Sequence, residues 1–337
     1  MRKKIIISIA TILSFTSIFF IYLSTYGIKT DNFNDYINDK VKEIDSKLSL
    51  DLQEVYLKLN LRQKSVKINT KNTKVYVEEN FIEFSEIDIN LDLIEFLRNN
   101  NSIKRIKLAT KDNSINNITN FLNSYRFSLP RLLIYKQIKA GNIKLIANIY
   151  FDEQNKQDFK YEISGFVSNA ELNLLNKNKL KNINFKFDIK DKIYNFENIK
   201  AKYQNINFQS NKISVVKVKE DFKINGSINN QKGLINPNIF SRIFNLNMDF
   251  LDTKKILLES NNDFSFTINS KRKIEDLIFD SKIKYNQIYF NKNFINLIYL
   301  KDGIIEASYN KKNFLADISG QYFFLDDKYS SDENKIK

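Results

Sequence analysis

The sequence predicts a mainly β protein in which a transmembrane helix and an amphipathic helix precede a long antiparallel sheet with a few short helices. Three observations predict this class. Residues 5–28 carry no charge, apolar residues then recur at spacings of three and four from Phe33 to Leu48, and beyond Val55 they recur at every second position. The two periods are those of a helix face and of a strand with one apolar face.

The N-terminal segment is long enough to cross a bilayer. A helix needs roughly 20 apolar residues to span the hydrocarbon core, and the uncharged residues 5–28 follow three cations, Arg2, Lys3 and Lys4. Because clustered positive charge stays on the cytoplasmic side, we expect the chain from Lys29 onward to lie outside the cytoplasm. The side chains expected in the membrane include Ile5, Phe15, Phe19, Phe20 and Tyr22.

A cleaved signal peptide is the alternative interpretation of this segment. Signal peptides have an apolar core of about 7–15 residues that ends at a small-x-small cleavage site. The core here is longer, and residues 24–27 (Ser-Thr-Tyr-Gly) do not place small residues at both paired positions. We therefore expect residues 1–28 to remain as a cytoplasmic tip and a transmembrane signal anchor.

The first segment after the anchor has helical periodicity. Its apolar residues lie at spacings of three and four: Phe33, Ile37, Val41, Ile44 and Leu48. This spacing places them on one side of a helix, and Asp31 or Asn32 is suited to cap its first turn. Such a helix covers the first strands, plugs the end of the sheet or lies on the membrane.

Alternation of apolar and polar residues fills most of the remaining chain. It is clearest at residues 55–61, 87–93, 183–189 and 264–268, and it recurs in shorter runs at 66–68, 75–77, 106–108, 143–149, 206–208, 222–228, 283–285 and 304–309. Each run predicts a strand with one apolar face. Strands that are polar on the other face are typical of antiparallel sheets.

Short helices and turns organise this β-rich chain. Helical spacing predicts short helices at 92–99, 114–125 and 239–244. We expect an N-terminal module of helix and sheet at 29–128, a second β-rich region at 129–325 and a polar, frayed tail at 326–337. Because the chain has only 7 Gly and 2 Pro, Asn and Asp are expected to form many turns, for example at 229–230 and 261–263.

The residue inventory argues against an enzyme. The chain contains no His and no Cys, so it lacks the usual general base near neutral pH, thiol nucleophiles and the commonest transition-metal ligands. It also has no glycine-rich phosphate loop and no nucleophile elbow. Asp88 and Asp92 fall on one strand face, which is ordinary for a solvated face. We expect no catalytic residue, no metal and no cofactor.

The net charge of +14 has two interpretations. Basic residues attract anionic lipid headgroups, whereas an AT-rich genome would enrich Lys, Asn and Ile without any function. The lysines are spread evenly and form no compact cluster in the sequence, so we expect no nucleic-acid partner.

The order of these features resembles the AsmA-like envelope proteins, of the YhdP and TamB types. The resemblance begins with the anchor, the amphipathic helix and the strand pair at 55–61 and 66–68, and it continues in Phe84-Ser-Glu-Ile-Asp-Ile-Asn-Leu-Asp-Leu-Ile94 and residues 103–110. In the second half it is carried by Gly-containing strands at 138–145, 163–172, 300–307 and 318–322. Many relatives are several hundred residues longer than this chain.

The resemblance implies an inner-membrane protein with its N-terminus in the cytoplasm and a periplasmic sheet curled into an open β-groove. It also implies a role in moving phospholipid toward the outer membrane or in the upkeep of that membrane. The partners would be the inner membrane, phospholipid or another envelope lipid, and other envelope proteins paired at the sheet edges.

An open trough of this kind would suit lipid because acyl chains lying in it leave water, at about 0.8 kcal/mol per CH₂ group. The residues expected to line it are Phe81, Phe84, Ile87, Ile89, Leu91, Phe185, Phe187, Phe264 and Phe266. Alternatively, the apolar faces close on each other in a sandwich, as in a structural or adaptor protein that assists outer-membrane protein assembly. An anchored carboxylate enzyme acting on envelope glycans is a third class.

Overall fold

The structure is a computed structural model that describes residues 2–29, 33–98, 102–125, 137–152, 159–173, 179–204, 206–235, 251–252, 256–290, 298–310, 313–324 and 334–336. Its strands form an antiparallel sheet that is not closed on itself, which confirms the mainly β class. The chain divides into two compact units: unit 1 is Met1–Tyr135 with Asn142–Gly165, and unit 2 is Lys136–Gly141 with Phe166–Lys337. The division runs across two long paired strands, β9 (Ile138–Phe151) and β10 (Phe159–Asn173).

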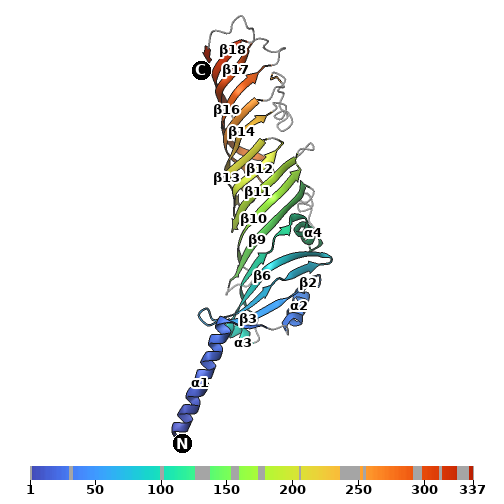
Figure 1. Cartoon of the computed structure of the whole chain (residues 1–337), viewed down its shortest axis with the longest axis vertical. Coiled ribbons are helices and arrows are strands. Elements are labelled where there is room, and N and C mark those ends of the chain that lie inside the picture. Colours follow the sequence, from blue (N-terminus) through green and yellow to red (C-terminus); the bar gives the residue numbers. More distant parts are fainter. Residues whose placement is uncertain are drawn as a thin grey trace. The chain divides into compact units, whose positions relative to one another are not determined.

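Unit 1 begins with the helix α1 (Arg2–Thr25), which is followed by the short strand β1 (Ile28–Lys29) (Figure 1). β1 pairs with β3, and Leu23 near the end of α1 packs against the apolar cluster of Leu59, Val66 and Leu91. Judged by length and hydropathy, no helix in the described part of the chain qualifies as membrane-spanning.

The sheet of unit 1 has the strand order β1, β3 (Glu54–Asn60), β4 (Ser65–Lys71), β6 (Asn80–Asp92), β7 (Ile103–Thr110) and β9. The start of β6 also pairs with β5 (Lys74–Val77), which in turn pairs with β2 (Leu48–Asp51). The two-residue strand β8 (Asn113–Ser114) pairs with β9. Three helices lie on these strands: α2 (Phe33–Ile44), α3 (Leu93–Leu97) and α4 (Ile115–Tyr125).

The helices of unit 1 each cover a particular part of the sheet. α2 lies on β2, α3 on β4 and β6, and α4 on β5 and β6. Phe121 of α4 is buried against Val77 and Ile82 of the sheet. Asp92 caps α3, because its Oδ1 accepts hydrogen bonds from the backbone N–H groups of Ile94 (2.8 Å) and Glu95 (2.9 Å). The short helices expected near 92–99 and 114–125 are therefore confirmed.

Unit 2 is a run of strands, all long except the last, each of which pairs with the next along the chain (Figure 1). They are β11 (Lys179–Lys190), β12 (Ile193–Tyr203), β13 (Ile206–Val218), β14 (Asp221–Ile235), β15 (Ile256–Ile268), β16 (Ile274–Tyr289), β17 (Ile298–Asn310), β18 (Asn313–Phe324) and β19 (Asn334–Ile336). The described residues of this unit form no named helix.

Several local expectations differ from the structure. α2 ends at Ile44, and Leu48 begins β2 instead of extending the helix. The turns expected at 229–230 and 261–263 are wrong, because these residues lie inside the paired strands β14 and β15, where Asn229 is opposite Asn261. The helix expected at 239–244 lies outside the described residues. Within the tail expected to fray, Asn334–Ile336 pairs with β18.

Candidate functional site

The candidate site is the apolar face of the sheet, taken separately in each unit. In unit 1 a ladder of directly opposed aliphatic residues crosses five strands, from β3 to β9: Leu57, Ile68, Ile89, Ile106 and Ile149. All five side chains are partly exposed. Cross-strand neighbours on one face lie about 5 Å apart, so the ladder is a continuous apolar strip.

The unit 1 residues predicted to line a groove fall into four environments. Ile87 and Ile89 are partly exposed, Leu91 is buried in the cluster beside α3, and Phe84 packs under α4. Phe81 is separate from these, because its ring lies 5.5 Å from that of Tyr76 and its strand neighbour Ile82 points to α4. An extra residue near Ser85 changes which positions of β6 face the helices.

Unit 2 carries a longer apolar strip, which we call the aromatic row. It consists of directly opposed residues on the eight strands from β11 to β18: Phe187, Phe196, Ile213, Gly226, Phe264, Phe279, Tyr309 and Phe314. A second row lies beside it on the first five of these strands: Ile189, Tyr194, Val215, Ile224 and Phe266. The side chains are partly exposed, and Phe314 is 67% exposed.

The four phenylalanines predicted in unit 2 all lie on this face. The ring centroids of Phe185 and Phe187 are 6.2 Å apart, and those of Phe264 and Phe266 are 6.0 Å apart. Phe185 also meets Phe196 edge to face at 5.8 Å. The structure thus places each predicted pair within an apolar surface that runs across the strands.

The opposite face of unit 2 is polar. Residues that alternate with the aromatic row include Lys186, Glu197, Lys212, Asp280 and Asp317, and all five are exposed. On this face Lys282 pairs with Glu306 at 2.7 Å and Lys284 pairs with Glu259 at 3.2 Å. The two faces therefore differ sharply in polarity, as the alternation of the sequence predicts.

A polar band interrupts the apolar face of unit 2. Asn262 Nδ2 donates to Ser260 Oγ (2.8 Å) and to the carbonyl oxygen of Ile228 (2.8 Å), while Ser281 Oγ donates to Asn262 Oδ1 (2.7 Å). Ser260 Oγ also donates to Asn230 Oδ1. Ser260 and Asn262 are four and two positions from Phe264, Ser281 is two from Phe279, and Asn230 is four from Gly226, so they lie on the face of the aromatic row.

Beyond the polar band the apolar face is tightly packed. The buried cluster there contains Tyr203, Ile206, Ile235, Ile256, Leu258, Tyr285, Ile288 and Leu300. Burial raises the pKa of Tyr285 above its ordinary value of 10.0, and its hydroxyl donates to the carbonyl oxygen of Ser319 at 3.1 Å. The accessible part of the face is therefore the part that carries the aromatic row.

The two acids singled out in the sequence are each paired with a cation. Asp88 is buried and lies 2.8 Å from Lys67, and Asp92 lies 2.8 Å from Lys104. The hydrogen bond from Lys104, together with those from the α3 backbone, holds the pKa of Asp92 below its usual 3.8. Among the described residues no three carboxylates converge on one point. These pairings favour structural roles for both acids.

Sequence reasoning missed several members of the aromatic row, including Phe196, Phe279 and Tyr309. The signal for Phe196 is the two-residue turn at Asp191-Lys192, which joins β11 to β12 and sets Phe196 opposite Phe187. Tyr309 follows the longer stretch 291–297, which gives no comparable register from the sequence. Phe279 is joined to Phe264 by the five residues 269–273, but the pairing of these strands shifts between Ser265 and Thr267, so a count back from the turn does not set it opposite Phe264.

The chain was compared with family models, curated proteins and solved structures. None of the three comparisons finds a match to this chain.

Proposed function

We propose that this protein is held in the inner membrane by α1 and that it binds or conducts phospholipid along the apolar face of its periplasmic sheet, in biogenesis or maintenance of the outer membrane. The observation that carries the proposal is the aromatic row, a partly exposed apolar strip on eight consecutive strands. Acyl chains that lie along such a strip leave water, which is favourable. Soluble proteins rarely expose apolar strips of this extent without a partner.

The side chains of α1 support an anchor. In the part of the helix with described side chains, apolar residues are exposed all round, including Ile12, Leu13, Phe15 (71% exposed), Phe19 and Ile21. Phe20 and Tyr22 are exposed as well, while the side chain of Ile5 lies outside the described part. A helix that is apolar on every side is stable when it is buried in protein or in lipid.

Partial exposure also argues for a trough over a closed sandwich. A sandwich core would bury both apolar faces against each other. The rings of Phe187, Phe196 and Phe264 instead remain partly exposed in unit 2, where the described residues place no helix on them. An adaptor protein built on a closed sandwich is therefore the less supported class.

Photo-crosslinking in living cells tests the proposal. A photoreactive phenylalanine analogue at Phe187 should capture phospholipid, which mass spectrometry of the purified full-length chain would identify. The matched control is the same analogue at Lys186, which is the next residue on β11 and lies on the opposite face. Capture at Phe187 with little at Lys186 is expected. Equal capture at both positions, or none at Phe187, would contradict lipid binding on this face.

A further inference from the structure

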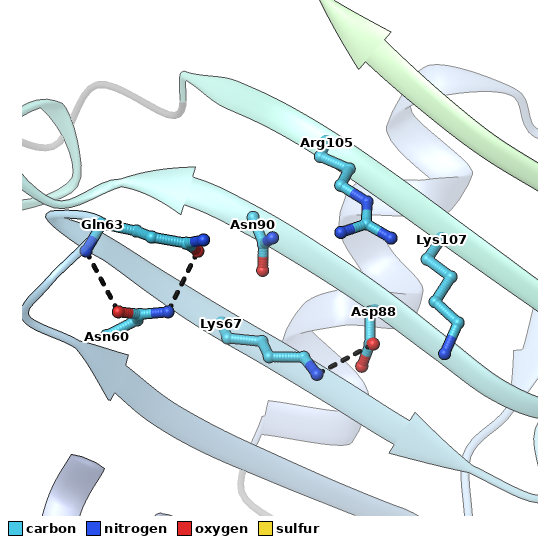
Figure 2. A pocket seen from close by; sticks show the side chains of 7 residues that line it. All are labelled: Asn60, Gln63, Lys67, Asp88, Asn90, Arg105 and Lys107. Atoms are coloured by element: carbon cyan, nitrogen blue, oxygen red, sulfur yellow. Dashed lines mark hydrogen bonds and ion pairs between the residues drawn. The ribbon is translucent and has the colours of Figure 1, made fainter. Parts of the chain in front are cut away.

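A polar pocket lies on the other face of the unit 1 sheet, away from the aliphatic ladder (Figure 2). Its volume is about 160 Å³. The residues that line it are Asn60, Gln63, Lys67, Asp88, Asn90, Arg105 and Lys107. Register explains their convergence, because Lys67, Asn90 and Arg105 are directly opposed on β4, β6 and β7, as are Asp88 and Lys107.

The charges in this pocket do not balance. Lys67 Nζ is 2.8 Å from Asp88, and Lys107 Nζ is 2.7 Å from Glu86, so these two cations already have carboxylate partners. The Lys107 hydrogen bond holds the pKa of Glu86 below its ordinary 4.5, which keeps Glu86 ionised at neutral pH. Asn69 Nδ2 also donates to Asp88. The remaining cation, Arg105, adds an uncompensated positive charge.

Arg105 forms no ion pair within the described residues. Its Nη2 donates to the neutral side chain of Asn148 (2.6 Å), its guanidinium carbon lies 5.6 Å from the Tyr150 ring centroid, and its Nε is buried without a hydrogen-bond partner. These contacts hold the planar fork in place while leaving donor capacity unused. Lys58, which also forms no ion pair with the residues that the structure describes, stands directly opposite Lys67 on β3, and like charges opposed in this way are unfavourable.

We propose that this pocket binds a phosphate group, as a monoester or a diester, with Arg105 as its principal ligand and Lys67 and Lys107 at its sides. A phosphate accepts paired hydrogen bonds from a guanidinium fork and removes the excess positive charge. Gln63 and Asn90 add amide donors to the lining, while the Asn60 amide donates to Gln63 Oε1 at 3.0 Å (Figure 2). The proposal is independent of lipid binding on the apolar face, because the pocket lies on the opposite face.

Calorimetric titration of the full-length protein in a non-ionic detergent and a phosphate-free buffer tests the site. The probes are inorganic phosphate, glycerol 3-phosphate and a short-chain phosphatidylglycerol used below its micelle concentration. Arg105→Gln should weaken binding about tenfold or more, because it removes hydrogen bonds to a charged group. Arg105→Lys keeps the charge but loses the fork, so it should also bind more weakly than the native protein.

The matched control is Arg98→Gln, which removes an arginine of the same unit that is paired with Glu95 outside the pocket. It should bind like the native protein, and circular dichroism would verify that every variant is folded. Binding of all three probes identifies the phosphate group itself as the ligand, and binding of the phospholipid alone that is weakened in Arg105→Gln identifies a headgroup. Phospholipid binding that Arg105→Gln leaves unchanged belongs to the apolar face and counts against this pocket. No binding of any probe, equal losses in Arg98→Gln and Arg105→Gln, or full binding by Arg105→Lys would overturn the proposal.

Discussion

Gly303 on β17 has no room for a side chain. A methyl group there would overlap the carbonyl oxygen of Ser319 and the hydroxyl end of Tyr285, which is the residue directly opposite on β16. The Tyr285 ring thus covers Gly303 of the neighbouring strand, and its hydroxyl donates a hydrogen bond to the carbonyl oxygen of Ser319 on β18. This arrangement fixes three strands of the packed cluster at one point.

We expect Gly303→Ala to lower the free energy of unfolding by about 1–3 kcal/mol, the usual cost of overpacking, as measured by urea denaturation. Gly320→Ala is the matched variant, because its new methyl group would meet chiefly the Tyr285 hydroxyl, at 2.5 Å. Adding Tyr285→Phe should therefore relieve Gly320→Ala but not Gly303→Ala, where backbone is also in the way. Equal relief of both variants would show that the backbone contact is unimportant.

At the scale of elements, the helix α3 depends on one side chain. Asp92 accepts hydrogen bonds from two N–H groups of its first turn and also pairs with Lys104. Leu93 and Phe96 of this helix pack against the buried cluster of Leu59, Val66 and Leu91. Loss of the cap should therefore loosen one end of the unit 1 sheet.

We expect Asp92→Ala to cost about 0.5–2 kcal/mol of stability near neutral pH, measured by denaturant unfolding. Asp92→Asn keeps a capping oxygen and should cost less. Since the folded pKa of Asp92 lies below its usual 3.8, the carboxylate adds stability above that pH and loses it as the pH falls through the folded pKa. The difference between the native protein and Asp92→Asn should therefore shrink on acidification, and a constant difference would exclude the charge as its source.

Most strands could be predicted because a sheet with one apolar face imposes a period of two on the sequence. β12 was missed because its alternation changes phase: Tyr194 and Phe196 are apolar at even positions, whereas Ile199 and Ala201 are apolar at odd ones. Asn198 lies at the change, with a φ of +53°. Asn169 in β10 and Asn182 in β11 have similar values.

The tolerance of Asn for left-handed backbone was expected to mark turns. In β10, β11 and β12 it instead marks points inside strands where the apolar side changes from odd to even positions or back. At Asn230 and Asn262 the side chains form the polar band. The sequence does not show whether an Asn forms a turn, marks a change of side within a strand or joins the polar band. Its role depends on which strand lies next to it in the sheet.

At the scale of the whole molecule, the phosphate pocket could not be predicted from the sequence. Its cations are Lys67 on β4 and the pair Arg105 and Lys107 on β7, almost 40 positions later in the chain, and only the pairing of both strands with β6 brings them together. The apolar face could be anticipated because its signal is local to each strand. A site built by the register of several strands can be recognised only once the fold is known, whereas an apolar face can be predicted from the alternation within each strand.

The proposed orientation can be tested because the chain contains no Cys. We expect a single cysteine at Lys271→Cys, in an exposed turn between β15 and β16, to react with a membrane-impermeant maleimide once the outer membrane is permeabilised. Lys4→Cys should react only after the inner membrane is lysed, because it precedes the proposed anchor. Protection of Lys271→Cys in cells with an intact inner membrane would place the sheet in the cytoplasm.

Each strand from β12 to β17 is bonded, among the described residues, to the strands just before and just after it in the chain. Two consecutive strands could therefore be duplicated or deleted in the gene while every other strand keeps its type of pairing, each with the strand before it and the strand after it. After an even number of added or removed strands, the next strand still runs in its original direction and keeps its apolar side on the same face. Each two-strand block changes the width of the sheet, measured across the strands, by about 10 Å. Evolution can thus adjust the reach of this architecture in discrete hairpin steps.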